Sequence, residues 1–319
     1  MLTAAHRLLP FRAARTSVAA NSSAGANLSD MTTVSAHSTR RAVVFMVLAV
    51  FSFTLLDALA KGLVANYPTI EVIWARFIGQ LFFVLIYLRR RIGAAMVTRF
   101  PAWHVARSVT QLGATGFFFA SLNFMGLAEA TALAEIGPVL ITVGAGLFLG
   151  EKLGRSRLIS VFVALIGALI VIRPGAGVFS PTALLPIVCA VSYAANILLT
   201  RLVGSRESHW AAMFYAAIFG TILCSVVLPF YWQPIALGDL PAFIALGASG
   251  AVAQLFIIRA YSLAEASAIA PFGYLDIVFA SVWSIVIFAE YPDSFTIVGA
   301  LVIAAAGLYV WRQEMVAPH

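Results

Sequence analysis

Charge is scarce in this chain. Asp, Glu, Lys and Arg make up 10% of its 319 residues, whereas hydrophobic residues make up 62%. Soluble globular domains carry about 25% charged residues, so the composition excludes a soluble protein. The apolar residues would fill about ten segments of roughly 20 residues, the length that an α-helix needs to cross a bilayer. We therefore predict an all-α, polytopic membrane protein with ten transmembrane helices.

Cysteine is rare as well. The two cysteines, Cys189 and Cys224, both lie inside apolar stretches. Their spacing fits neither a metal site nor a disulfide framework. We expect two buried thiols that pack like small hydrophobic side chains, and we predict no metal site.

Catalytic and nucleotide-binding motifs are missing. The sequence has no His-Glu-x-x-His, no paired Asp motif of the prenyl-transfer type and no Gly-x-x-x-x-Gly-Lys loop. A membrane-embedded enzyme is therefore the weaker alternative, and no bound cofactor is expected. A transporter without a nucleotide-binding domain would depend on facilitated diffusion or on an ion gradient. The five histidines are expected in tails or loops: His6, His37, His104, His209 and His319.

Ten apolar stretches follow Arg41, and the short polar breaks between them are rich in Pro, Gly and Arg. We predict transmembrane helices over residues 42–63, 69–88, 103–123, 128–149, 157–173, 182–203, 210–230, 240–260, 266–289 and 295–311.

The segment before these stretches, residues 1–41, is polar and rich in Ala and Ser. It has three arginines before its first acid, Asp30. This composition predicts disorder. A transit peptide is one alternative interpretation, and translation from Met31 is another.

The net charge of +7 does not by itself indicate nucleic-acid binding, because positive charge also orients helices in a bilayer. If the N-terminus is cytoplasmic, most Lys and Arg residues fall on the cytoplasmic side, and only Lys61 and Arg173 fall outside. We predict a bacterial inner-membrane protein with both termini in the cytoplasm. Its expected partners are the lipid bilayer and a small-molecule substrate, with no nucleic acid; homo-oligomerisation is left open.

The two halves of the apolar region repeat each other. Lys61 recurs as Arg201 140 residues later, and Glu151 recurs as Glu290 139 residues later. The predicted domains are residues 42–174 and 182–312, with five helices each. Because five is odd, the two copies must lie upside down relative to each other in the membrane. Inverted repeats are typical of carriers that open a midplane site alternately to each side, and they fit a channel less well.

Several motifs recur at corresponding places in the two halves. They are Glu135-Ile136-Gly137-Pro138 and Phe148-Leu149-Gly150-Glu151-Lys152-Leu153, then Ala270-Pro271-Phe272-Gly273-Tyr274-Leu275 and Phe288-Ala289-Glu290. With these motifs the halves resemble the two domains of the EamA family of the drug/metabolite transporter superfamily, over essentially all of residues 42–312. Ile277 stands where the family commonly has Pro, so the helix break expected in the fourth span is expected to be missing from the ninth.

A further set of motifs narrows the resemblance. They are Glu207-Ser208-His209-Trp210, Met213-Phe214-Tyr215 and Tyr231-Trp232, together with residues 270–276 and 288–293. They are similar to the group that holds S-adenosylmethionine uptake carriers and bacterial riboflavin transporters. The resemblance implies import of a cofactor-sized, ring-bearing metabolite, with riboflavin as the first candidate and S-adenosylmethionine as the next. Export of amino acids or toxic amphiphiles is the alternative that the same fold supports.

Four ionisable residues lie within the predicted spans: Asp57, Arg76, Glu135 and Asp276. Such groups cost several kcal/mol in a bilayer unless they are paired or face water. At a rise of about 1.5 Å per residue, the first three share a level near the outer side, and Asp276 lies near the middle of its span. We predict that Asp276 contacts substrate or a proton, and that Asp57 and Glu135 line the cavity with Arg76 beside them. A structural ion pair is the alternative for Arg76.

Neutral polar side chains complete the predicted binding site. Hydroxyls and amides suit hydrogen bonds to a heterocycle, and aromatic faces suit stacking on a ring. The candidates are Gln111, Tyr193, Asn196, Gln254 and Tyr274. The alternative interpretation is hydrogen bonding between helices, worth about 1 kcal/mol or less in membranes.

Overall fold

The structure is a computed structural model that describes residues 28–89, 93, 98, 100–149, 155–172, 181–203, 209–263 and 270–316. The chain divides into two units, Met1–His37 and Ser38–His319. The helical bundle belongs to the second unit. Residues 1–27 of the segment predicted to be disordered, and the repeat residue Glu151, lie outside the described residues.

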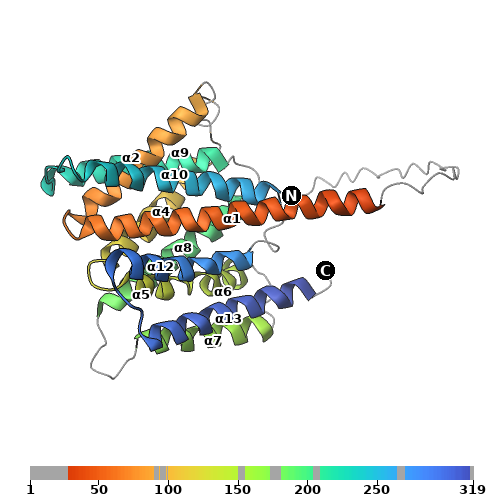
Figure 1. The fold of residues 1–319 in the computed structure, drawn as a ribbon. Helices are drawn as coiled ribbons and strands as arrows, with labels where there is room; N and C mark the ends of the chain where they lie inside the picture. The colour runs from red at the N-terminus through yellow and green to blue at the C-terminus, as the bar shows by residue number, and fades with distance from the viewer. Residues whose placement is uncertain are drawn as a thin grey trace, which may run out of the picture. The chain divides into compact units, whose positions relative to one another are not determined.

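All regular secondary structure in the described part of the chain is helical (Figure 1). The α-helices are α1 (Leu28–Val64), α2 (Thr69–Leu88), α4 (Pro101–Ser121), α5 (Leu127–Ala134), α6 (Gly137–Leu149), α7 (Arg155–Ile172), α8 (Leu184–Val203), α9 (His209–Val227), α10 (Leu240–Leu263), α12 (Leu275–Phe288) and α13 (Ser294–Val316). Short 3₁₀ helices are η2 (Pro181–Ala183), η4 (Leu228–Phe230) and η5 (Ala270–Tyr274). The all-α prediction is confirmed. Helix α1 begins at Leu28, earlier than the predicted end of the disordered segment at residue 41.

Six helices in the described residues are long and apolar enough to cross a membrane. They cover Arg40–Val64, Thr69–Leu88, Leu127–Phe148, Pro181–Thr200, Trp210–Phe230 and Leu240–Ala260. Shorter apolar helices cover Phe162–Val171, Phe272–Phe288 and Ser294–Tyr309. The polytopic architecture is confirmed, and the number of ten spans stays a prediction.

The fourth predicted span is interrupted near its middle. Helix α5 ends at Ala134, Glu135 and Ile136 form a turn, and α6 begins at Gly137. Pro138 has no backbone N–H to donate, and proline is favoured in the first turn of a helix. This proline explains why a new helix begins here, and the turn places the Glu135 carboxyl at a helix break.

The ninth predicted span also changes helix type, at the position that corresponds to this turn. The 3₁₀ helix η5 gives way to α12 at Leu275. No non-helical residue separates η5 from α12, in contrast to the turn in the fourth span, so the expectation that Ile277 removes the break stays a prediction. Pro271 lies inside η5, where it cannot donate a backbone hydrogen bond and disfavours α-helical geometry in the residue before it.

Corresponding helices of the two copies run antiparallel. Tyr87 near the end of α2 stacks on Trp210 near the start of α9, with ring centroids 4.4 Å apart. At the other end of this pair, the Trp74 indole N–H donates to the Ser225 hydroxyl at 2.8 Å. When the two copies are exchanged, α2 corresponds to α9 and α10 corresponds to α4. Both equivalent contacts are present, α2 with α10 and α9 with α4. This is the geometry of an inverted repeat.

Glycine allows two pairs of helices to approach closely. A Cβ atom built on Gly79 of α2 would lie 2.5 Å from the Cα atom of Gly247 on α10. Between α7 and α13, a Cβ atom on Gly167 would lie 2.9 Å from the Gly299 carbonyl oxygen. Small residues at helix crossings are typical of membrane bundles, where close backbone packing holds helices together.

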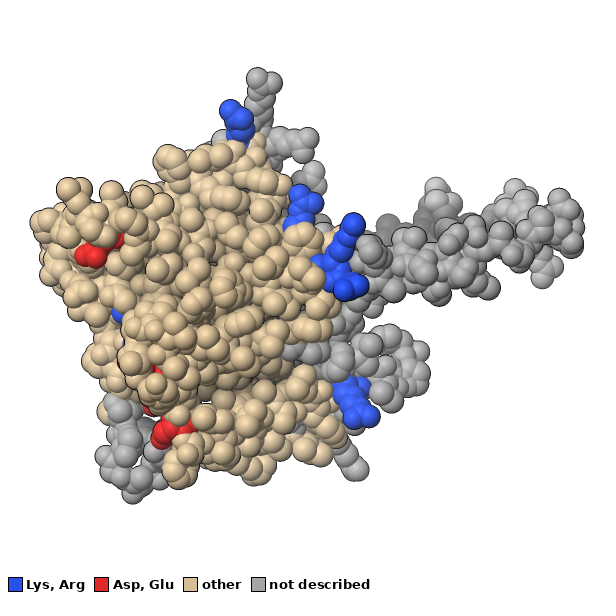
Figure 2. Space-filling view, viewed as in Figure 1, with Lys and Arg blue, Asp and Glu red and all other residues tan. Residues whose placement is uncertain are grey.

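Basic and acidic side chains gather at opposite ends of the helical bundle (Figure 2). Exposed arginines lie where the apolar part of α1 begins, just after α2, and near the ends of α10 and α13: Arg40, Arg41, Arg89, Arg259 and Arg312. The acids at the opposite helix ends are Glu71, Glu129, Asp239, Glu290 and Asp293. One end of the bundle is therefore basic, and the other is predominantly acidic.

Candidate substrate site

The four ionisable residues predicted within the spans come together in the structure. Asp57 of α1 interacts electrostatically with Arg76 of α2 and with Asp276 of α12. Asp276 in turn lies within hydrogen-bonding reach of Glu135 in the turn between α5 and α6. We call these four residues the carboxylate cluster. Asp276, which the sequence placed deeper than the other three, belongs to the same group.

A helix break and a change of helix type position two of the three carboxyl groups. Glu135 follows the last residue of α5, and Asp276 lies in the first turn of α12. A carboxylate in the first turn of a helix is stabilised by the helix dipole. Transporters with inverted repeats commonly place their sites at interrupted helices in corresponding positions of the two copies, and this pair fits that pattern.

Arg76 is held on several sides. One of its Nη atoms donates a hydrogen bond to the Thr115 hydroxyl of α4. The guanidinium carbon lies 5.6 Å from the Phe77 ring centroid and 5.7 Å from that of Phe119. Its buried Nε atom has no hydrogen-bond partner among the described residues. These contacts fix the guanidinium beside Asp57 and leave one donor available in the bundle interior.

Sequence reasoning missed Thr115. The one signal in the sequence was its place on α4, one helical turn after the candidate Gln111, so that both lie on one face of the helix. A threonine in an apolar span carries no charge that would single it out.

Two further side chains border the cluster. The side chain of the candidate Tyr274, in η5, interacts with Glu135. Cys189 of α8 is 8% exposed and lies in electrostatic contact with Asp57, Arg76 and Glu135. Both cysteines are buried as predicted, but no feature of the sequence indicates that one of them lies beside the candidate site.

Tyr193 lies one helical turn after Cys189 on α8. A Cβ atom on Gly137 would meet its ring at 3.4 Å, so the tyrosine packs against the start of α6. The tyrosine as a whole residue is 44% exposed. Tyr193 therefore presents an aromatic face close to the helix break that carries Glu135.

The remaining candidates are not joined to the cluster by a described contact. The Asn196 amide donates to the Arg107 carbonyl at 2.8 Å and to the Thr110 hydroxyl at 3.2 Å. These bonds tie α8 to α4 and favour the helix-packing interpretation of Asn196. The described residues provide no hydrogen-bond partner for the side chains of Gln111 and Gln254.

The prediction that the histidines lie in tails or loops is wrong for three of them: His37 lies within α1, His104 lies within α4, and His209 is the first residue of α9. His104, expected in a loop, lies in the first turn of α4 and is 2% exposed. Its ring stacks on Tyr215 of α9, with centroids 4.6 Å apart. Helix α4 begins with Pro101, which starts the helix early enough to bring His104 into the packed bundle.

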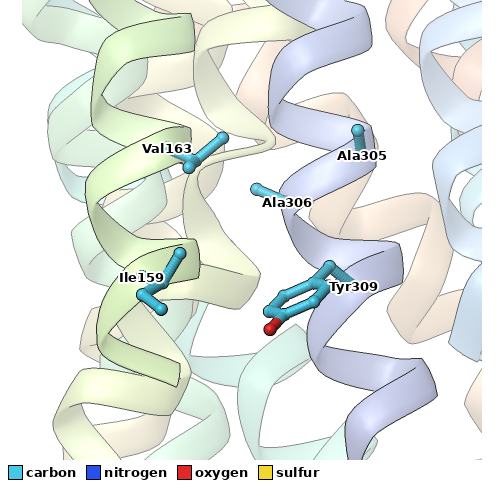
Figure 3. Close-up of a pocket in the computed structure, with 5 residues that line it drawn as sticks. All are labelled: Ile159, Val163, Ala305, Ala306 and Tyr309. Atoms are coloured by element: carbon cyan, nitrogen blue, oxygen red, sulfur yellow. The ribbon is translucent and has the colours of Figure 1, made fainter. Parts of the chain in front are cut away.

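A separate pocket lies between α7 and α13 (Figure 3). It has a volume of about 230 Å³ and is lined by Ile159, Val163, Ala305, Ala306 and Tyr309. The tyrosine hydroxyl is the only polar side-chain group among these five. This pocket offers no charge partner for a soluble metabolite, in contrast to the carboxylate cluster.

Comparison with known proteins shows transporters over both halves of the chain. The EamA-like transporter family matches residues 40–173 and again residues 180–312. A pseudopaline exporter of Pseudomonas aeruginosa is 29% identical over 279 residues, covering 85% of this chain and 96% of the relative. An S-adenosylmethionine uptake transporter of Rickettsia felis is 26% identical over 271 residues, covering 85% and 92%.

Two further comparisons agree. A riboflavin transporter of Rhizobium johnstonii is 29% identical over 281 residues, covering 86% of this chain and 93% of the relative. A solved crystal structure with 17% sequence identity matches at a TM-score of 0.62, covering 88% of this chain and 99% of the other, and supports the fold alone. The chain belongs to the EamA-like transporter family, and it is a membrane transporter, not an enzyme.

Proposed function

We propose that this chain is a secondary carrier of a bacterial inner membrane that imports a positively charged metabolite, S-adenosylmethionine first, by alternating access. The observation that carries the proposal is the carboxylate cluster, in which three carboxyl groups and one guanidinium meet inside an apolar bundle. A bilayer tolerates such groups when they are paired or face a water-filled cavity. A carrier for a charged solute needs paired charges in the protein and a water-filled path to them.

The cluster contains more acid than base. The electrostatic partners of Arg76 are Asp57 and Cys189. Glu135 and Asp276 are instead within reach of each other. Two carboxyl groups within hydrogen-bonding reach repel each other when both are charged, so the proposed mechanism assigns them one shared proton. In the proposed mechanism a substrate cation takes the place of that proton, and the pair becomes fully charged around it.

The charge of S-adenosylmethionine suits this arrangement. Its sulfonium and ammonium groups suit the Glu135–Asp276 pair, and its carboxylate suits the guanidinium of Arg76. Riboflavin is neutral and has no group that needs a carboxyl pair. The sequence analysis ranked riboflavin first by resemblance, and the charge of the cluster reverses that order.

Riboflavin is the second candidate. The exposed face of Tyr193 next to the α5–α6 break suits stacking on a flavin ring. The relative named a riboflavin transporter supports the same interpretation.

The charge separation supports the proposed orientation. Arginine gathers at the cytoplasmic ends of transmembrane helices, so the basic end of the bundle faces the cytoplasm. The apolar part of α1 begins and α13 ends at this side, which fits the proposal that both termini are cytoplasmic. The predominantly acidic end is then the outer side.

Uptake of labelled S-adenosylmethionine and labelled riboflavin into cells that express the chain tests the proposal. We expect S-adenosylmethionine to accumulate, and we expect Asp276→Asn and Glu135→Gln to lower its uptake about tenfold or more, because each removes a charge-assisted contact. Glu129→Gln makes the same acid-to-amide change on α5, outside the cluster, and should transport normally.

Each of the other outcomes contradicts a specific part of the proposal. Accumulation of riboflavin alone would replace the proposed substrate. Faster loss of S-adenosylmethionine from preloaded cells, without uptake, would reverse the proposed direction. Normal uptake by both cluster variants, at normal expression, would remove the Glu135–Asp276 pair from the site.

A further inference from the structure

One ammonium group joins three segments at the predominantly acidic end of the bundle. Lys61, in the last turn of α1, forms an ion pair with Glu290, two residues beyond α12. The same Nζ atom donates to the Met125 carbonyl at 3.3 Å, in the turn between α4 and α5. It also lies 5.1 Å from the centroid of the Phe288 ring.

The end of α12 is shaped to present the Glu290 carboxylate. Ala289 takes a left-handed conformation with φ of 54° and ends the helix. The Glu290 N–H then donates to the Ser284 carbonyl at 3.0 Å, which closes the chain back onto the helix. The Ser284 hydroxyl donates to the same carboxylate at 3.4 Å. A Cβ atom on Gly126 would lie 3.3 Å from this carboxylate, so glycine leaves it room.

The two partners differ in their access to water. The Lys61 side chain is 10% exposed, and the Glu290 side chain is 42% exposed. An ammonium buried to this extent is costly without a partner. If the pair separates, Lys61 must therefore move into water, and the outer end of α1 must move with it. Separation of the pair would therefore replace this closed contact by a hydrated one.

The segments joined by Lys61 also carry the three carboxyl groups of the cluster. Asp57 lies one helical turn before Lys61 on α1. Helix α5, which follows the Met125 turn, leads to Glu135, and α12 begins next to Asp276 and ends next to Glu290. A separation of α1 from α12 at their outer ends would therefore give water a path toward the cluster.

We propose that Lys61, Glu290 and the Met125 carbonyl form an outer gate of the carrier, closed in this structure, and that the ion pair must separate for the site to face outward. The inference rests on the proposed transport function, because a carrier must open its site to each side in turn. Lys61 and Glu290 are gating residues here, outside the substrate contacts.

The native thiol of Cys189 can report on this gate, because it is buried beside the cluster. The experiment measures how fast a membrane-impermeant maleimide added outside intact cells labels Cys189, in a Cys224→Ser background. Lys61→Met and Glu290→Gln should raise the rate about three- to tenfold, since each removes the pair that holds the gate closed. Lys61→Arg keeps the charge and should label at the original rate.

The second part of the experiment exchanges the charges of Lys61 and Glu290. Lys61→Glu alone should label fast, and Lys61→Glu with Glu290→Lys should return most of the way to the slow rate. Unchanged labelling in Lys61→Met and Glu290→Gln, in proteins of normal thermal stability, would overturn the gate. Labelling uses no substrate, so a failure of S-adenosylmethionine uptake would count against the proposed function and leave this result intact.

Discussion

The cost of burying charge explains which residues sequence reasoning could find. Asp57, Arg76, Glu135 and Asp276 stand out because an ionisable group in an apolar span needs a partner or water. Counting residues at a constant helical rise grouped the first three and set Asp276 apart. That count assumed one regular helix over residues 266–289. The count describes depth along each span and not which side chains face one another, and the bundle brings Asp276 within hydrogen-bonding reach of Glu135.

Neutral residues could not be assigned by the same reasoning. Thr115 and Cys189 carry no charge, and only the fold shows that they border the cluster. Asn196 could be either a ligand or a packing residue in the sequence, and its bonds to Arg107 and Thr110 favour packing. Hydrogen bonding between helices uses the same side chains as substrate binding, so spacing alone does not separate them.

Thr115→Val tests whether the orientation of Arg76 matters for binding. The substitution removes the hydroxyl that accepts the Arg76 hydrogen bond. We expect the affinity for S-adenosylmethionine to fall about tenfold, the size of a lost hydrogen bond to a charged group. Thr221→Val is the matched control, because the described residues give the buried Thr221 hydroxyl no partner. Equal affinities in the two variants, measured by binding to purified protein, would show that Thr115 does not position Arg76.

Tyr67 gives a pH-dependent prediction outside the membrane spans. Its hydroxyl donates to Asp239 at 2.6 Å and accepts the Ala236 N–H at 3.1 Å, which ties the α1–α2 turn to the segment before α10. The hydrogen bond to Asp239 raises the pKa of Tyr67 above its ordinary value of 10.0. The protonated phenol is therefore favoured by folding. Its contribution to stability is complete below the unfolded pKa and is lost as pH rises through the higher folded pKa.

We therefore expect Tyr67→Phe to lower the thermal midpoint by about 2 °C at neutral pH. The difference from the parent protein should stay constant up to about pH 9 and shrink above about pH 10, since the parent loses the same bond there. Midpoints of both proteins measured across this range check the prediction. A difference that disappears below pH 8 would point to another titrating group.

At the level of helices, the apolar stretches predicted the described elements closely because length and hydropathy dominate in a bilayer. The predicted span 69–88 coincides with α2. The break inside the fourth span followed from Pro138, and the change of helix type in the ninth did not follow from Ile277. Pro271 in η5 disfavours α-helical geometry in the residue before it. This position lies ahead of Ile277, where the family commonly has Pro.

The crossing of α2 and α10 depends on glycine at Gly79. An alanine Cβ there would lie 2.5 Å from the Gly247 backbone, which cannot move aside as a flexible side chain can. We expect Gly79→Ala to destabilise the protein by about 1–3 kcal/mol, the usual cost of overpacking. Gly62→Ala is the matched control, because its Cβ would lie 4.0 Å from the nearest atom, on Phe288.

Thermal unfolding of the purified variants measures this difference. Gly79→Ala should melt several degrees below the parent protein, whereas Gly62→Ala should match it or melt slightly higher, since alanine favours helix. Equal melting of the two variants would mean that α2 and α10 do not cross as closely as the structure shows.

At the scale of the whole molecule, the inverted repeat follows from the sequence because an odd number of helices per copy leaves only that arrangement. The antiparallel pairing of α2 with α9 agrees with it. The substrate could not be predicted in the same way. The motifs that resemble uptake carriers for S-adenosylmethionine also resemble those for riboflavin, whereas the charge of the cluster depends on side chains that meet only in the fold.

The central claim is that a substrate cation replaces a proton shared by Glu135 and Asp276. Calorimetric binding of S-adenosylmethionine to the purified carrier, in buffers that differ in ionisation enthalpy, measures the protons released on binding. The account predicts release of about one proton per bound molecule, both in the parent protein and in Glu129→Gln, and no release in Glu135→Gln. Binding of S-adenosylmethionine to the parent protein without proton release would contradict it.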